Sequence, residues 1–414
     1  MTTTADVVVI GGGPAGASAG YWLASRGHRV VIVERRSFPR SKACGDVVTP
    51  RAVHQLEAMG LGPALDQWHH LDGVRLVGHG HRRELAWPRH PDTPSYGLVV
   101  RRRELDELVV QQASDAGAEV LHGHDAVEPI VERGFVRGAL VRSALGALHE
   151  VRSHYVVVAD GANSTFGRTL GTSRSRDWPY ATAIRSYWPS PRHLDHQMEL
   201  SLDLTDRQGA AVPAYGWVAP VGDGTVNVGV GLLSTARDFK SLNVAHLLDA
   251  YVTDAAERWN IDPAATTGVV RMGRVPMGAS VQPNAGPTFL VVGDAAGAAS
   301  PFTGVGIDAA YETGRLAAEV LHAALGESGP TALQRYPRLL ADAYGDPYKT
   351  ARLWARLLGR PSVMQRVGGL AARSQTVADA ALRIMTGSLR DDAFALPEAA
   401  SRAASAVLRA APDA

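Results

Sequence analysis

The sequence predicts an α/β fold with two layers: a parallel sheet flanked by helices, and a second, antiparallel sheet above it. Three observations predict this fold. Residues 74–87 and about 183–280 alternate between apolar and polar side chains, which favours an antiparallel sheet. Residues 331–414 have the composition of helices. Short apolar runs typical of buried parallel strands lie at residues 5–10, 29–34, 155–159 and 289–292.

Composition excludes several classes of protein. The 42 basic and 41 acidic residues give a net charge of +1, which is not the signature of a nucleic-acid binder. The single cysteine, Cys44, excludes an internal disulfide and a cysteine-rich zinc site. No cysteine flanks the paired histidines, His69/His70, His79/His81 and His122/His124, and we expect no metal. No apolar stretch reaches the ~18 residues that span a bilayer, and residues 1–6 lack signal-peptide features. We expect a cytoplasmic protein, with peripheral contact at the inner membrane face left open.

The first strand runs directly into a glycine motif, G-x-G-x-x-G, which is followed by a helix. Gly11 permits the tight turn, Gly13 lets the backbone approach a pyrophosphate, and Gly16 lets helix and strand pack closely. Pro14 and Ala15 begin the helix, whose free N–H groups favour phosphate. The motif therefore predicts a Rossmann-like site for a dinucleotide.

Glu34 ends the second strand, 18 residues beyond Gly16. A carboxylate at this point accepts hydrogen bonds from a ribose diol, so the dinucleotide is expected to be FAD or NAD(H) rather than NADPH. Arg35, the next residue, is included in the same expected site.

Two later strands end in small polar turns. Asp160 and Gly161 follow the strand at 155–159, and Gly293 and Asp294 follow the strand at 289–292. Asp294 is placed to hold a ribityl hydroxyl. A turn before a long helix then brings a partly positive helix N-terminus to the pyrimidine end of a flavin. The residues of this turn in the expected site are Pro301, Gly304, Val305, Gly306 and Ile307.

With these three motifs the chain resembles the FAD-dependent group that includes aromatic hydroxylases, flavin halogenases and geranylgeranyl reductases. The resemblance implies FAD as cofactor and a fold of the aromatic-hydroxylase type. It implies that Arg102, in an R-x-x-L-D helix start, contacts FAD. A second glycine motif is not present, so NAD(P)H or another reductant is expected only as a transient electron donor. The expected domains are FAD-binding (1–73, 97–175 and 285–330), substrate-binding (74–96 and 176–284) and C-terminal helical (331–414).

The loop at residues 38–52 is the most diagnostic stretch. It resembles the F-P-R-x-K-x-C-G-D-G-L-x-P-R-A loop of geranylgeranyl reductases, including bacterial menaquinone side-chain reductases. The resemblance places Cys44 and Gly45 near the flavin, where the thiol either donates or relays a proton or serves as a small buried apolar group.

Tyr215 and Trp217 lie in a segment that resembles the Y-x-W-x-F-P motif of the same reductases. The two rings are expected on one face of a strand, where they either stack on isoprene units or form a core aromatic pair. Asn227 alternates with apolar residues in the next strand and is a further candidate for that face.

We therefore expect an FAD-dependent enzyme that reduces C=C bonds in a prenyl chain, geranylgeranyl or menaquinone-like, with Cys44, Tyr215 and Trp217 as catalytic candidates. Val305 stands where the reductases often have Glu, and this departure slightly favours an alternative, a monooxygenase that hydroxylates an aromatic or polyketide-like substrate. Independently of Val305, a flavoprotein without enzymatic activity is a further alternative. The sequence leaves the oligomeric state undetermined.

Residues 351–373 carry five arginines and no acid: Arg352, Arg356, Arg360, Arg366 and Arg373. A basic amphipathic helix of this kind either lies on an anionic membrane or packs on the protein with its arginines in water.

Overall fold

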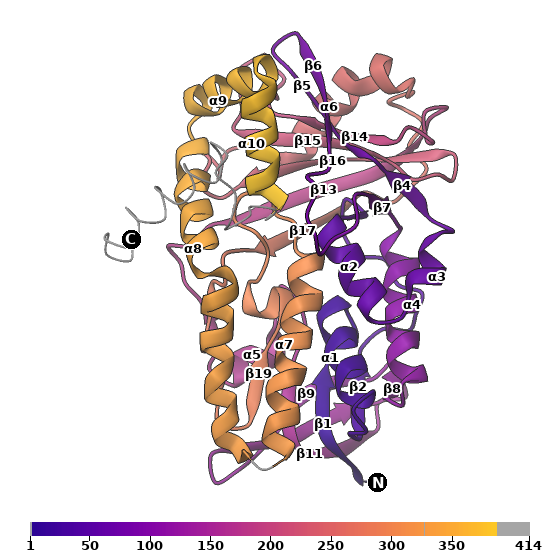
Figure 1. The fold of residues 1–414 in the computed structure, drawn as a ribbon, viewed down its shortest axis with the longest axis vertical. Helices are drawn as coiled ribbons and strands as arrows, with labels where there is room; N and C mark the ends of the chain where they lie inside the picture. The colour runs from indigo at the N-terminus through magenta and orange to yellow at the C-terminus, as the bar shows by residue number, and fades with distance from the viewer. Residues whose placement is uncertain (1, 327, 387–414) are drawn as a thin grey trace.

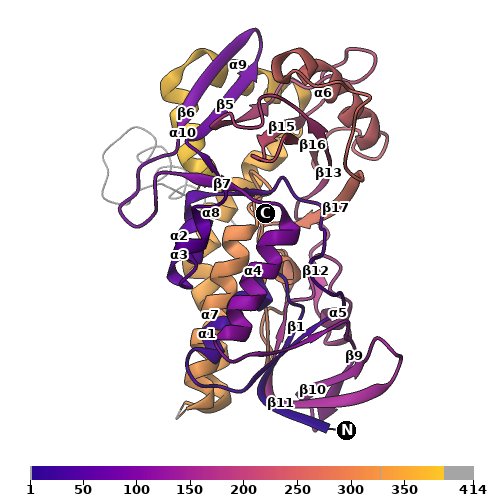
Figure 2. The ribbon, with the colours of Figure 1, turned by 90° about the vertical axis from the view of Figure 1, so that its right-hand side faces the viewer.

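The computed structural model describes residues 2–326 and 328–386. The elongated molecule has an α/β layer at one end and a second sheet at the other, and a long C-terminal helix spans both (Figures 1 and 2). The part of the expected helical region at residues 387–414 lies outside the described residues.

The α/β layer is built on a seven-stranded sheet with the order β8-β2-β1-β11-β10-β9, in which β19 also pairs with β11. Strands β1, β2, β8, β11 and β19 pair in parallel. Both faces of β1 are buried, which explains why its sequence is apolar without alternation. Helices α1 (Pro14–Ala24), α4 (Arg102–Asp115) and α7 (Ile307–Leu325) cover one face. The strands are β1 (Thr2–Ile10), β2 (Val30–Glu34), β8 (Glu119–His122), β9 (Asp125–Glu132), β10 (Phe135–Arg142), β11 (Leu148–Val158) and β19 (Phe289–Val291).

The second sheet also has seven strands, in the order β17-β13-β16-β15-β14-β5-β6. Five neighbouring pairs are antiparallel, as expected, but β14 and β5 pair in parallel, which the long connection between them permits. Helix α6 (Val244–Trp259) packs on one face through a large apolar cluster. The strands are β5 (Gly73–Gly78), β6 (His81–Ala86), β13 (Tyr180–Pro189), β14 (Gln197–Ser201), β15 (Ala214–Pro220), β16 (Thr225–Leu233) and β17 (Arg271–Pro276).

Three C-terminal helices join the layers. Helix α8 (Arg335–Leu358) runs along both of them, and the Tyr336 hydroxyl at its start donates to Val291 O in β19. The chain then breaks before Pro361, so the basic stretch at 351–373 forms two helices rather than one. Its second part is α9 (Pro361–Arg373), and α10 (Gln375–Thr386) follows.

Short elements connect these layers. In a small sheet, β3-β7-β4, strand β3 directly follows the loop around Cys44 and pairs with β7, which comes after β5 and β6 of the second sheet in the chain. The short elements are β3 (Val47–Val48), α2 (Pro50–Ala58), α3 (Gly62–Leu65), β4 (His69–Leu71), β7 (Gly97–Val99), α5 (Thr165–Thr169), β12 (Ser173–Arg174), β18 (Val281–Gln282), η1 (Gly293–Ala296) and η2 (Gly329–Gln334).

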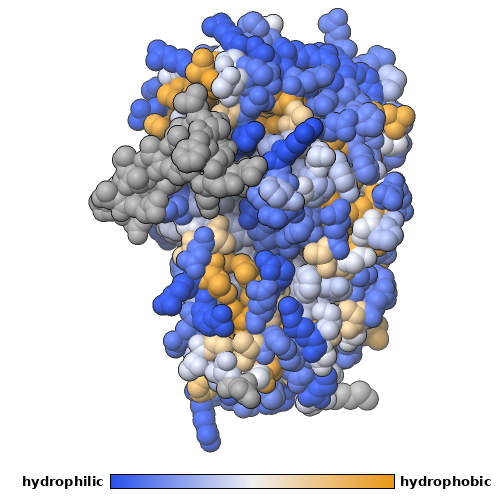
Figure 3. Space-filling view, in the orientation of Figure 1, coloured by the Kyte–Doolittle hydropathy of each residue, from blue (hydrophilic) through white to orange (hydrophobic). Residues whose placement is uncertain are grey.

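Within residues 2–326 and 328–386, no helix has the length and apolar content needed to cross a bilayer. The face in Figure 3 is mostly hydrophilic, with separate apolar patches over the lower part of α7 and α8 and over α9.

Candidate functional site

The glycine turn between β1 and α1 has the geometry of a phosphate cradle. Gly11 has φ +104°, and a Cβ there would lie 2.4 Å from Ala159 O. A Cβ at Gly16 would lie 1.9 Å from Gly11 O, so α1 and β1 approach as closely as they do only because this residue is glycine. At Gly13, by contrast, a Cβ would meet only the end of the Arg40 side chain, at 3.4 Å. Gly13 caps α1 without a side-chain hydrogen bond, so the turn presents free N–H groups.

Glu34 stabilises this turn from the end of β2. Its carboxylate is buried and accepts hydrogen bonds from the backbone N–H groups of Gly12 and Arg36, both at 2.9 Å. Arg40 approaches the same carboxylate at 3.6 Å. Arg35 is exposed next to Glu34. The acid therefore lies where the sequence predicts a ribose-binding group.

The two later turns, Asp160-Gly161 and Gly293-Asp294, reach the same end of the parallel sheet. Asp160 follows β11, and its Oδ1 is buried without a hydrogen-bond partner, while Oδ2 accepts from Phe166 N at 2.9 Å. A buried carboxylate oxygen without a partner is costly and favours a ligand that donates hydrogen bonds. Asp294, after β19, forms an ion pair with Lys42 Nζ at 2.7 Å. This ion pair links the Cys44 loop to the late motif.

The loop before α7 completes this end of the sheet. Gly306 caps the 19-residue α7 without a side-chain hydrogen bond, and Ile307 is its first buried residue. Val305 O accepts from Ser300 N, and Val305 N donates to Thr303 Oγ1, so the loop is held by its own hydrogen bonds. Pro301 is buried beneath it.

Arg102 lies in a buried ion cluster at the start of α4. Its guanidinium pairs with Asp106 at 2.8 and 2.9 Å, and Arg40 pairs with the same carboxylate at 3.0 Å. Arg102 also lies next to the Cys44 thiol. Two guanidinium groups on one carboxylate leave positive charge at a place where a pyrophosphate is expected.

Asp46, which sequence analysis did not include in the site, anchors the Cys44 loop. It is fully buried with φ +62°. Its Oδ2 accepts from the Tyr187 hydroxyl and from Asn227 Nδ2 at 2.8 Å, and its Oδ1 accepts from Arg102 N at 3.3 Å. Burial raises the pKa of Asp46, and these donors act in the opposite direction. Asn227 Nδ2 also donates to Cys44 O at 3.0 Å, so the loop is fixed to the second sheet.

Burial raises the pKa of the Cys44 thiol, and the charge of Arg102 opposes this shift. The thiol is therefore protonated at neutral pH. A protonated thiol at this position is compatible with both readings of Cys44, a proton donor and a small apolar group.

Tyr215 and Trp217 lie on one face of β15, as expected, with ring centroids 6.0 Å apart. Each ring lies over a glycine of β16: Gly231 opposite Tyr215 and Gly229 opposite Trp217. The Tyr215 hydroxyl donates to Thr303 O at 3.0 Å, which ties the second sheet to the loop before α7. Burial raises the pKa of Tyr215 to about 12, so this hydroxyl keeps its proton.

The indole of Trp217 reaches the Cys44 loop. Its Nε1 donates to Asn227 Oδ1 at 3.1 Å, and a Cβ at Gly45 would lie 3.2 Å from that nitrogen. The three catalytic candidates therefore surround one region, with Cys44 on the loop and the two rings on the sheet.

The residues present fit FAD. The uncapped glycine turn suits a pyrophosphate, Glu34 a ribose, and Asp160 and Asp294 hydroxyl groups. Sequence analysis missed Lys42, Asp46 and Tyr187. Lys42 and Asp46 are charged residues within the loop at 38–52, which the sequence already marks as diagnostic. Tyr187 lies on β13, opposite this loop. Among the described residues, no cluster of His, Cys, Asp and Glu is arranged to bind a metal.

Comparisons with known proteins agree with this arrangement. The model of one protein family, described as "FAD binding domain", matches residues 4–339. The chain is 39% identical to a menaquinone reductase of Mycobacterium tuberculosis over 391 residues, 94% of this chain and 92% of that protein. It is 30% identical to digeranylgeranylglycerophospholipid reductase 1 of Methanopyrus kandleri, over 85% of this chain and 90% of that protein.

Solved structures show the same fold at lower identity. A geranylgeranyl bacteriochlorophyll reductase-like protein of Thermoplasma acidophilum superposes with a TM-score of 0.79 at 21% identity, covering 98% of this chain and 100% of that one. A flavin-dependent brominase superposes with a TM-score of 0.76 at 20% identity, covering 99% of this chain and 100% of that one.

Proposed function

The chain belongs to the FAD-binding family and, within it, to the geranylgeranyl reductases and their menaquinone reductase relatives, and from this premise we propose that it reduces C=C bonds in the prenyl chain of a menaquinone-like lipid. The enzyme is an FAD-dependent oxidoreductase, and a separate reductant supplies its electrons.

One observation carries the proposal beyond family membership. Two stretches most resemble the reductases, the Cys44 loop and the Tyr215–Trp217 strand; Cys44 and Tyr215 lie 171 residues apart in the chain, yet the two stretches meet in the fold. Trp217 contacts Gly45, and Asn227 bonds to both Trp217 and Cys44 O. The residues that carry the resemblance therefore lie together in the fold rather than at two separate places.

FAD, when bound and reduced, supplies the hydride that a C=C bond accepts. The glycine turn and Glu34 hold its adenosine and pyrophosphate part, and Asp160, Asp294 and Arg102 line the path toward the Cys44 loop. Tyr215 and Trp217 present apolar ring faces that position an isoprene unit and exclude water.

Reduction of a C=C bond also needs one proton at the second carbon. Cys44 has the chemistry for this role, because its raised pKa keeps a proton on Sγ at neutral pH. After donation, Arg102 next to the sulfur would stabilise the thiolate. Cys44→Ser, which keeps a proton but lowers acidity, should bind FAD normally and turn over more slowly, whereas Cys44→Ala should lose the protonation step.

The direct test uses the enzyme with its flavin reduced under anaerobic conditions. A prenylated menaquinone is then added. The proposal expects flavin reoxidation without oxygen and a product heavier by two hydrogen atoms in the side chain. If none of the prenyl lipids tested reoxidises the flavin, the proposed reductase function is overturned.

The alternative is a monooxygenase, and Val305 is the observation that favours it. Valine at this position removes the carboxylate that the reductases often carry next to α7, and a flavin-dependent brominase has the same fold, so the fold alone does not fix the reaction. Turnover that requires oxygen and adds one oxygen atom would establish this alternative.

Peripheral membrane contact suits a lipid substrate, and we include it in the proposal for a cytoplasmic enzyme. Arg352 stacks on Trp178 at 4.0 Å and Arg356 donates to Asp177 O, so these two pack on the protein. Arg360, Arg366 and Arg373 are exposed on or next to α9. Replacing these three by Ala should reduce co-sedimentation with anionic vesicles. Equal sedimentation of the variant would count against this contact.

A further inference from the structure

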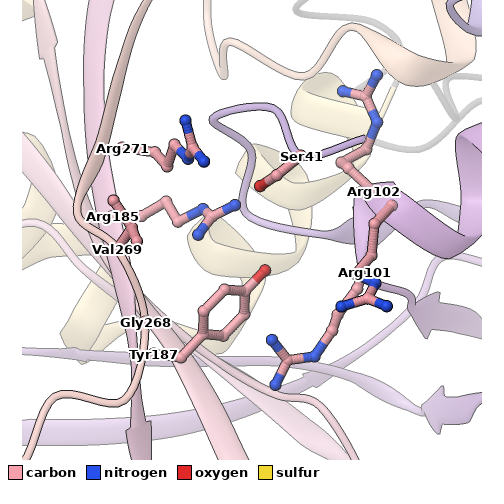
Figure 4. A pocket seen from close by; sticks show the side chains of 9 residues that line it. Ser41, Arg101, Arg102, Arg185, Tyr187, Gly268, Val269 and Arg271 are labelled. Carbon is pink, nitrogen blue, oxygen red and sulfur yellow. The ribbon is translucent and has the colours of Figure 1, made fainter. Parts of the chain in front are cut away.

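A cavity lies on the side of the Cys44 loop that faces strands β13 and β17 (Figure 4). Its volume is about 180 Å³, room for roughly six water molecules at ~30 Å³ each. Arginine side chains from three separate segments of the chain converge on it. The lining residues are Ser41, Arg101, Arg102, Arg103, Arg185, Tyr187, Gly268, Val269 and Arg271.

Carboxylates compensate only part of this charge. Arg101 pairs with Asp223 at 2.6 Å, and Arg102 pairs with Asp106. Among the described residues, no carboxylate forms a direct ion pair with Arg103, Arg185 or Arg271, although the charge of Arg185 acts on the buried carboxylate of Asp46. With buried Asp46 included, the cavity keeps an excess of positive charge.

Two of these arginines stand directly opposite each other. Arg185 on β13 and Arg271 on β17 are paired in the antiparallel register, so their side chains share one face. Like charges at opposed positions destabilise a sheet. An anion between the two guanidinium groups would reverse this repulsion.

Part of the cavity wall is held in place by contacts within the protein. Tyr187 contacts two guanidinium groups, with Arg101 at 4.0 Å and Arg185 at 4.5 Å from its ring centroid. Arg185 donates to Lys42 O at 2.8 Å and to Cys44 O at 3.2 Å. Arg103 and Arg271 are exposed, so the cavity combines a rigid inner wall with an outer side open to solvent.

We propose that this cavity binds a phosphate group of a small molecule. A phosphate monoester or diphosphate carries two or more negative charges on several oxygens, which matches the guanidinium groups of Arg103, Arg185 and Arg271, none of which forms a direct ion pair with a described carboxylate. The phosphate belongs either to a pyridine nucleotide or to a lipid headgroup. Exposed Val269, Val270 and Met272 next to Arg271 are the reason to include the lipid source. The proposal does not rest on the reductase activity.

The test is titration calorimetry of FAD-saturated enzyme with inorganic pyrophosphate, at an ionic strength of about 0.15 M, where nonspecific attraction is screened beyond ~8 Å. We expect one bound pyrophosphate per chain. Arg271→Ala together with Arg103→Ala, both at exposed positions, should weaken binding about tenfold or more. Arg274→Ala is the matched control: it removes an exposed arginine from the same strand outside the cavity, and binding should be unchanged.

Two further arms identify the source of the phosphate. If NADP⁺ binds more tightly than NAD⁺, and the double variant loses this difference, the site is assigned to a nucleotide phosphate. If the enzyme binds vesicles of phosphatidylglycerol but not of phosphatidylcholine, and the same variant loses this binding, the site is assigned to a lipid headgroup. The proposal is overturned if pyrophosphate does not bind, if Arg274→Ala weakens binding as much as the double variant, or if FAD abolishes binding.

Discussion

The hydrogen bond between Tyr187 and Asp46 should hold the Cys44 loop on the second sheet, and a double-mutant cycle can measure this. Tyr187→Phe removes one of three donors to a fully buried carboxylate. Asp46→Asn keeps the size and tolerates φ +62°, but places an amide N–H among donors that need an acceptor.

The magnitude follows from the charge and burial of the acceptor. A hydrogen bond to a buried charged group contributes about 1.5–3 kcal/mol. Each single substitution should therefore lower the opening free energy of the loop by at least this amount, and the coupling between the two should be about 1.5–3 kcal/mol. In exchange rates this corresponds to roughly ten- to 150-fold.

Native-state hydrogen exchange of the Val100 amide measures the opening, because Val100 N donates to Asp46 O at 2.8 Å. Tyr155→Phe combined with Asp46→Asn is the control cycle, because the Tyr155 hydroxyl donates to Ala324 O and shares no partner with Asp46. That cycle should be additive within about 0.5 kcal/mol. A coupling for Tyr187 no larger than this control would refute the role given to the hydrogen bond.

Three further predictions concern the cofactor, the thiol and acid stability. Glu34→Ala should weaken FAD binding by about 1–3 kcal/mol, because hydrogen bonds to the ribose and to the glycine turn are lost. A purified variant whose flavin absorbance shows full FAD occupancy would contradict this. Because the pKa of Cys44 is raised by burial, alkylation of the native thiol by iodoacetamide should still increase with pH above 9.0, and a plateau below that pH would contradict it. Burial raises the pKa of Asp195, but hydrogen bonds from Arg75 and Arg192 outweigh this effect, so its pKa lies below the ordinary 3.8. The contribution of Asp195 to the stability of the fold is thus present above pH ~4 and is lost as pH falls through the lowered pKa. Asp195→Asn should lower the urea midpoint at pH 7 and flatten its decline in acid, whereas parallel pH curves for the two proteins would exclude this contribution.

The parts of the site that sequence predicted are those with a local cause. The glycine turn, Glu34 at a strand end and the shared face of Tyr215 and Trp217 follow from spacing along one element. The order of the motifs around Asp160 and Asp294 placed both at one edge of the parallel sheet, and the structure agrees.

The missed parts depend on contacts between distant segments. Asp46 meets Tyr187 across 141 positions and Asn227 across 181, and Lys42 meets Asp294 across 252. No periodicity encodes such contacts. The parallel pairing of β5 with β14 was missed for the same reason, since alternation within a strand does not specify the direction of its neighbour.

The parallel sheet has a consequence for biosynthesis. Strand β1 is synthesised before its neighbour β11, which ends at Val158, and β19, which pairs with β11, is complete only at Val291. At a translation rate of about 5–20 residues per second, roughly 15–60 s separate the first strand from the last. The late Asp294 and the N-terminus of α7 arrive later still. Both neighbours of β1 exist once Val158 has been made, but β11 lacks its parallel partner β19 until Val291. The flavin site that Asp294 and α7 complete can therefore form only after that point.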